Sequence, residues 1–98
     1  MEHIRNLKLM SLTTLYLDYN QIGVDGCYYL SRIPLQSLHT LDLSHNKVDV
    51  DGTKHLVHGS WPMLRTLLID DNQITEKGLA ILGNGEWTML VFVKAKNN

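Results

Sequence analysis

The sequence predicts an α/β fold in which similar coils, each a short strand followed by a short helix, stack into a solenoid. Three observations predict it. Leucines recur at a step of 26 residues, at Leu12, Leu38, Leu64 and Leu90. Apolar and polar residues alternate after each of them, as in a strand with one buried face. A helix-like segment then returns the chain to the start of the next strand, so the strands must run parallel.

One motif defines the repeat. Residues 38–48 read L-x-x-L-x-L-x-x-N-x-φ, where φ is aliphatic, and residues 12–22 and 64–74 follow the same pattern. The step divides the chain into a partial repeat at 1–11, full repeats at 12–37, 38–63 and 64–89, and a partial repeat at 90–98. We therefore expect one domain of about three and a half repeats.

Each strand is expected to span five residues, at 14–18, 40–44 and 66–70, with a fourth strand beginning within 90–95. In the first strand, Leu15 and Leu17 face the core, and Tyr16 and Asp18 face the other way. The threonines near the start of each strand should form a ladder, a setting that suits β-branched residues. They are Thr14, Thr40 and Thr66.

An asparagine follows each strand, at Asn20, Asn46, Asn72 and Asn98. A buried backbone bend leaves N–H and C=O groups without partners, at a cost in free energy. Asparagine has both a donor and an acceptor, so its side chain can satisfy such groups in its own coil and in the next one. The conserved spacing within the chain therefore predicts a row of asparagines along the turns.

Helices are expected after these turns, with Asp49 and Thr75 as N-caps. A further short helix is expected at 2–8. Glycines near the helix starts should leave room for packing on the strands; they are Gly26, Gly52 and Gly78. The apolar helix residues expected to face inward are Cys27, Leu30, Leu56, Leu79 and Leu82, while Leu35, Trp61 and Trp87 anchor the return to the next strand.

These repeats resemble the leucine-rich repeat superfamily, over residues 4–98. The segment 72–82, with Asn-x-Ile-x-x-x-Gly-x-x-x-Leu, is similar to the ribonuclease-inhibitor-like subclass. The 26-residue period also resembles the cysteine-containing repeats of F-box adaptors, with asparagine in place of the cysteine. The resemblance implies a curved, right-handed solenoid with parallel strands on the concave face and helices on the convex face. It also implies a binding function, usually for protein, through the concave face.

Composition limits the class of protein. The chain has 98 residues, a formal net charge of −1 and 44% hydrophobic residues, which favours a folded domain over a disordered tail. No block of like charge suggests a nucleic-acid or membrane-surface partner. The single cysteine, Cys27, cannot form an intrachain disulfide, and no apolar stretch has the length of a signal-peptide core or a membrane span. We therefore expect a cytoplasmic protein, with a secreted effector lacking a cleaved signal as the alternative.

The informative side chains are those that the repeat does not demand. Nine fall on or just beyond the concave face: Tyr16, Asp18, Tyr19, Asp42, Ser44, His45, Leu68, Asp70 and Asp71. Aromatic residues beside carboxylates suit a protein interface and predict a partner of basic or mixed charge. Lys94 and Lys96 reverse the sign in the last strand. The alternative interpretation is a merely solvated face.

Catalytic and metal chemistry have little support. His55 and His58 stand three apart on one helix, a spacing that two metal ligands can use, but no third ligand accompanies them. His39 and His45 are candidate bases beside Asp42, yet no nucleophile, phosphate-binding loop or paired-carboxylate pocket accompanies them. Cys27 at a helical position is better interpreted as a small buried residue than as a reactive thiol. We expect no enzyme, cofactor or metal site.

Three functions remain open. The first is a protein-interaction module that uses the concave face. The second is a structural or assembly piece of a longer repeat array or adaptor, which self-associates through the uncapped last strand. The third, a regulator of a small GTPase, rests on fold analogy alone.

Overall fold

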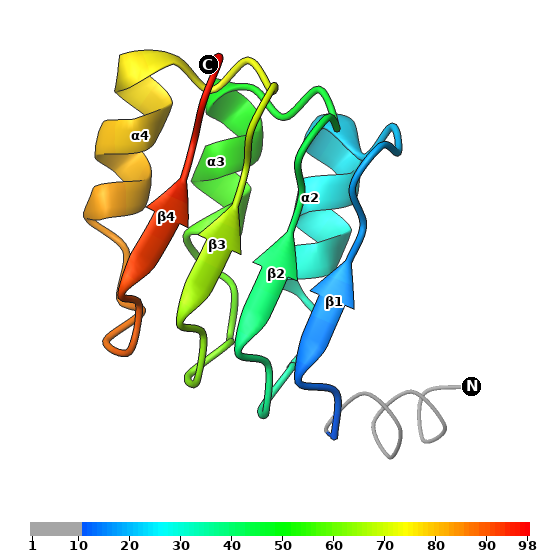
Figure 1. Ribbon diagram of the computed structural model, residues 1–98, viewed down its shortest axis with the longest axis vertical. Helices are drawn as coiled ribbons and strands as arrows, with labels where there is room; N and C mark the ends of the chain where they lie inside the picture. Colours follow the sequence, from blue (N-terminus) through cyan, green and yellow to red (C-terminus); the bar gives the residue numbers. More distant parts are fainter. Residues whose placement is uncertain (1–10) are drawn as a thin grey trace.

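The computed structural model describes residues 11–98 and shows alternating strands and helices (Figure 1). The order is β1 (Thr14–Tyr16), α2 (Gly23–Ser31), β2 (Thr40–Asp42), α3 (Val50–Leu56), β3 (Thr66–Leu68), α4 (Thr75–Gly83) and β4 (Phe92–Lys94). The strands form one parallel sheet in the order β1-β2-β3-β4, and the helices cover one of its faces. This confirms the predicted fold class. The helix expected at 2–8 lies outside the described residues.

The sheet is in the register that the 26-residue step predicts. Leu15 pairs with Leu41, Leu41 with Leu67, and Leu67 with Val93. The threonine ladder is present as well, since Thr14 pairs with Thr40 and Thr40 with Thr66. In β4 the same place is taken by Phe92. A constant register means that side chains at equivalent positions lie in rows across the sheet.

The strands have three residues each and are therefore shorter than the five residues expected. The pairing nevertheless continues past the strand ends: the Leu17 amide donates to the Asp42 carbonyl at 2.9 Å and the Tyr19 amide to the Ser44 carbonyl at 3.0 Å. The chain then bends at Tyr19, which has φ 60°, and at its equivalent His45, which has φ 58°. The left-handed bend ends the regular strand while the coils stay side by side.

The core lies between the sheet and the helices. Leu38, Leu41 and Leu43 are fully buried, and their equivalents Leu64, Leu67 and Ile69 are at most 1% exposed. The predicted helix residues are buried too, except Leu79, which is half-buried. Full burial of one such side chain contributes about 1.5–3 kcal/mol. The middle coils, which have a neighbouring coil on both sides, hold the best-buried residues.

The asparagine row is formed as predicted at Asn46, Asn72 and Asn98, whereas the Nδ2 atom of Asn20 donates only to carbonyls of its own coil within the described residues. The Asn72 Oδ1 atom accepts from the amides of Asn46 and Val48, both at 2.9 Å, in the preceding coil. Its Nδ2 donates to the carbonyls of Leu43 at 3.0 Å and Ile69 at 3.1 Å, one in each coil. Asn46, Asn72 and Asn98 each link two coils in this way. Each of these asparagines thus supplies partners for buried backbone groups on both sides of a coil boundary.

The helix starts differ from the prediction at one coil. Asp49 is the N-cap of α3, and its carboxylate accepts from the Gly52 amide at 2.8 Å. Thr75 was expected to cap α4 but is its first residue, and the N-cap position, Ile74, makes no side-chain cap hydrogen bond. Thr75 has φ 63°, close to the 58° of the equivalent Gly23. The backbone at this position is left-handed in both coils, which prevents the extended geometry that a threonine cap requires.

A side chain at any of the three glycines near the helix starts would be obstructed, but not by the strand layer as expected. A Cβ on Gly78 would lie 2.5 Å from Cγ2 of Ile74, and one on Gly26 would meet Ile22 at the same distance. On Gly52 it would lie 3.2 Å from Sγ of Cys27 in α2. The obstruction therefore comes from the aliphatic residue of the preceding turn and from the neighbouring helix, rather than from the strand layer.

Thr75→Gly is expected to stabilise the fold. A left-handed backbone costs an L-residue about 1–2 kcal/mol, while the extra chain entropy of glycine costs about 0.5–1 kcal/mol, so a net gain of about 0.5–1 kcal/mol follows. Gly23→Thr should lower the free energy of unfolding by a similar amount, because a Cβ there meets nothing within 4 Å and only the conformation is strained. Urea unfolding followed by tryptophan fluorescence measures both. A loss of stability in Thr75→Gly contradicts the explanation.

Cys27 is expected to make the stability depend on alkaline pH. Burial, and secondarily the Asp49 carboxylate, raise the pKa of this thiol from its ordinary 9.0 to about 12. As the pH rises above 9.0, the unfolded chain loses the thiol proton and the folded chain keeps it. The free energy of unfolding is therefore unaffected by this thiol below that pH, and above it the free energy falls by up to about 1.4 kcal/mol per pH unit. The difference between wild type and Cys27→Ala in urea unfolding isolates this effect, and equal pH dependence in both proteins would rule it out.

Candidate binding face

The sheet face that points away from the helices, hereafter the open sheet face, is built from rows of equivalent side chains. One row contains Tyr16, Asp42, Leu68 and Lys94, one from each strand and paired in register. The row therefore changes along the sheet from aromatic to acidic, aliphatic and basic. Two further rows follow it at the step of 26 residues: Asp18, Ser44, Asp70 and Lys96, then Tyr19, His45, Asp71 and Asn97.

The structure distributes the nine predicted residues unequally. Tyr16 is 66% exposed and Tyr19 is 73% exposed, so both rings offer most of their surface to solvent. Six others are half-buried, among them Asp70, whose side chain is only 14% exposed, and Ser44 is buried. Ser44 is 9% exposed, its amide donates to Asp42 Oδ1 at 3.0 Å, and its hydroxyl oxygen accepts from the Asp70 amide at 3.1 Å. Ser44 thus orients its neighbours and offers little surface for contact.

The negative charge of Asp70 is compensated by two groups of the neighbouring fourth coil. The Lys96 amide donates to its Oδ1 at 2.7 Å, and the Lys94 ammonium lies 3.1 Å from its Oδ2. The hydrogen bond from the Lys96 backbone, together with the Lys94 side chain, lowers the pKa of this carboxyl group. Sequence reasoning placed opposite charges on the face but missed this pairing. The repeat step gives the signal, since it sets Lys96 opposite Asp70.

The outer row is joined by side-chain contacts. The rings of Tyr19 and His45 stack with centroids 4.0 Å apart and 10° between planes. His45 Nε2 lies 3.0 Å from Asp71 Oδ2, and Asn97 Nδ2 donates to Asp71 Oδ1 at 2.9 Å. The carboxylate partner of His45 is therefore Asp71 and not Asp42, beside which the sequence offered it as a weakly supported candidate base. A continuous chain of contacts crosses all four coils.

Of the two histidines expected on one helix, only His55 lies in α3, which ends at Leu56; His58 follows in the turn. The His55 ring lies edge-on to Tyr28 of α2, with centroids 5.4 Å apart. Tyr28 also contacts Tyr29 edge-on at 5.3 Å. These aromatic residues form an exposed cluster on the helix side that sequence reasoning did not single out. Within residues 11–98 no group of three or more histidine, cysteine or acidic residues is placed to hold a metal ion.

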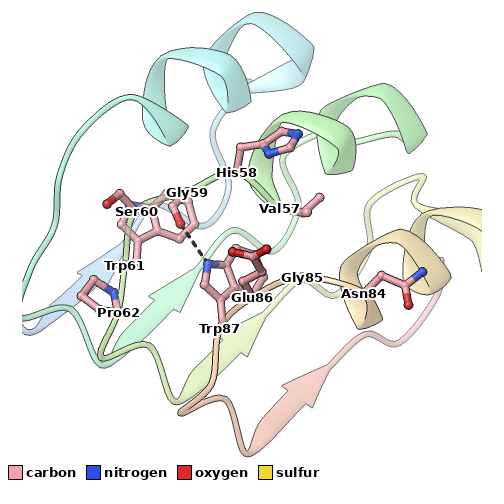
Figure 2. A pocket seen from close by; sticks show the side chains of 10 residues that line it. All are labelled: Val57, His58, Gly59, Ser60, Trp61, Pro62, Asn84, Gly85, Glu86 and Trp87. Atoms are coloured by element: carbon pink, nitrogen blue, oxygen red, sulfur yellow. Dashed lines mark hydrogen bonds between the residues drawn. The ribbon is translucent and has the colours of Figure 1, made fainter.

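A groove of ≈ 490 Å³ lies between the loops that follow α3 and α4 (Figure 2). Residues 57–62 and 84–87 line it. Trp61 and Trp87 stack on each other with ring centroids 5.7 Å apart, and the indole N–H of Trp87 donates to the Gly59 carbonyl at 3.1 Å. At only 1% and 8% exposure, both rings are core residues, as the sequence predicted. The groove itself was missed; its signal is glycine at 59 and 85, where the first coil has Ile33.

A scan of family models matches the model described as Leucine Rich repeat to residues 8–31 and 35–56. These matches fall on the first and second coils of the sheet, so the motif and the architecture agree. The chain belongs to the leucine-rich repeat superfamily. No curated protein and no solved structure matches the chain. Among the described residues, no helix has the length and apolar character needed to cross a bilayer.

Asp70→Asn is expected to weaken the acid-dependent part of the stability. A carboxyl group with a lowered pKa stabilises the fold above its unfolded pKa, and this contribution is lost as the pH falls through the folded pKa. The melting temperature of the wild type should therefore fall more steeply from about pH 6 to about pH 3 than that of the variant. Lys94→Met, which keeps the Lys96 amide bond, should show an intermediate effect. Identical profiles for wild type and Asp70→Asn would contradict the assignment.

Proposed function

We propose that this chain is a protein-interaction module that binds a protein partner of basic or mixed charge through the open sheet face. Leucine-rich repeats are commonly protein-interaction modules, and this supports the class of function. The observation that supports the face is the exposure of Tyr16 and Tyr19, at 66% and 73%. Tyrosine is enriched among the residues that dominate binding energy, because a rigid ring adds contact area and a hydroxyl group.

The groove of Figure 2 supports a binding role less well. Its two tryptophan rings stack on each other, so these ring faces are already covered. The indole N–H of Trp61 donates to the Ile33 carbonyl and that of Trp87 to the Gly59 carbonyl, both at 3.1 Å. A ligand in the groove would therefore contact mainly backbone and the polar rim. The open sheet face offers larger aromatic surface and charged groups together.

The exposed tyrosines give a direct test. The double variant Tyr16→Ala/Tyr19→Ala should reduce recovery of the specific partner at least about tenfold in quantitative affinity purification from cells that express the gene. Tyr28→Ala/Tyr29→Ala is the matched control, because it removes two exposed tyrosines from the helix side. We expect the control to retain the partner. Loss in the control with retention in the double variant would place binding on the helices and refute the proposal.

A second candidate function is assembly, and the exposure of β4 favours it. Val91 is 81% exposed and Phe92 is 52% exposed, and Val93 at the core register is also largely open. Another copy or further repeats would cover these apolar side chains if they packed on this strand. On this model Phe92→Lys should abolish self-association seen by sedimentation velocity. A wild-type monomer over a wide concentration range would exclude self-association.

A further inference from the structure

We infer that the partner presents an arginine to the open sheet face, and that its guanidinium group binds beside Tyr16 and Tyr19 against the carboxylates of Asp18 and Asp42. This inference rests on the proposed function and specifies the chemistry of the partner. It confines the main contact to the first two coils. The last two coils are then secondary contacts.

The two exposed rings mark this end of the face. Tyr16 lies on β1 directly opposite Asp42 on β2. Tyr19 lies three residues after Tyr16, and its amide donates to the Ser44 carbonyl of the second coil at 3.0 Å. Its ring is held in place by the stack on His45 at 4.0 Å. Neighbouring strands are about 4.8 Å apart, so a single side chain of a partner can contact residues of both coils.

Of the four carboxylates on the open sheet face, the two with side-chain partners in the described part of the chain both lie in the third coil. Asp70 pairs with Lys94 at 3.1 Å, and Asp71 pairs with His45 at 3.0 Å. On the helix side, Asp51 pairs with Lys54 at 3.4 Å. Within residues 11–98 no cation lies at ion-pair distance from Asp18 or Asp42. Within residues 11–98, the carboxylates that have no side-chain partner therefore lie in the same two coils as the exposed tyrosines.

Asp42 is oriented for this contact. Its Oδ1 accepts from the Ser44 amide at 3.0 Å, and this bond restrains the carboxylate. Its other oxygen, Oδ2, has no hydrogen-bond partner in the described part of the chain. A side chain that is already fixed loses little entropy when a cation binds. Asp42 is thus a pre-organised acceptor.

Arginine fits this arrangement better than lysine. The guanidinium group is planar, so it can stack on a tyrosine ring while its N–H groups reach carboxylates in its plane. Lysine has a compact and strongly hydrated ammonium group, which satisfies a carboxylate but does not stack. A cation placed over an aromatic ring gains further attraction. Two rings and two carboxylates on adjacent coils therefore match a guanidinium group.

The test uses three capped tripeptides with glycine on either side of arginine, lysine or citrulline, titrated into the folded chain and followed by ¹H–¹⁵N NMR. Citrulline has nearly the shape of arginine without its charge. The arginine peptide should shift the amides of Tyr16, Asp18, Tyr19 and Asp42, with an affinity at least about tenfold above that of the citrulline peptide and above that of the lysine peptide. Equal affinity for any pair that includes arginine overturns the inference.

Variants separate this site from general charge effects. Asp42→Asn keeps the oxygen that accepts from Ser44, so the fold is retained, and it should weaken the arginine peptide about tenfold. Asp51→Asn removes the same charge from the helix side and should have no effect. Equal weakening by both variants overturns the inference. If Tyr16→Ala/Tyr19→Ala loses the partner in affinity purification but Asp18→Asn/Asp42→Asn retains it, the proposed function stands and the arginine site fails. If neither double variant loses the partner, the proposed function fails as well.

Discussion

The structure depends on the hydrogen bonds that asparagine side chains make across coil boundaries. Asn72 is 7% exposed and Asn46 is fully buried, and each bonds to backbone groups of its own coil and of the preceding one. Without these side chains the bends after the strands would bury unpaired amides and carbonyls, at about 1–3 kcal/mol for each group. Because the bonds repeat at 26 residues, they also fix how far each coil is shifted relative to the next. The register of the sheet and the rows on its open face follow from that spacing.

A fixed register places residues that are 26 positions apart in the sequence side by side on the sheet. Asp70 receives the Lys96 amide and the Lys94 ammonium only because the fourth coil lies beside the third at a set height. Tyr19 stacks on His45 for the same reason. The first two coils have no such compensation for Asp18 and Asp42 within residues 11–98. The chemistry of the open face is thus decided by which coils are adjacent, and a partner meets a polarised surface rather than four independent strands.

The periodic part of the structure could be predicted from the sequence, and the pairwise part could not. The strand positions, the leucine core, the threonine ladder and the asparagine row each repeat, so several copies support each prediction. Thr75 was misjudged because its side chain suits a cap, whereas its φ of 63° is set by the turn it shares with Gly23. The pairing of His45 with Asp71, at 3.0 Å, depends on side-chain rotamers, which composition and spacing do not encode. The nine candidate residues were found because they depart from the repeat, but their unequal exposure became visible only in three dimensions.

Internal pairing and partner binding compete for the same side chains. A partner cation that approached Asp70 would have to displace Lys94 and would still leave the Lys96 amide bonded to the carboxylate, so much of its binding energy would be offset. The same partner at Asp42 displaces no ion pair within residues 11–98, because only the Ser44 amide is bonded there and that bond can remain. Contact with Tyr16 and Tyr19 would also remove apolar ring surface from water, which is favourable. At the β1–β2 end both terms favour the proposed arginine, whereas at the β3–β4 end, where Phe92 is also exposed, the apolar gain is opposed by the loss of the pair between Asp70 and Lys94. The electrostatic term therefore decides which end of a repetitive surface the proposed arginine selects.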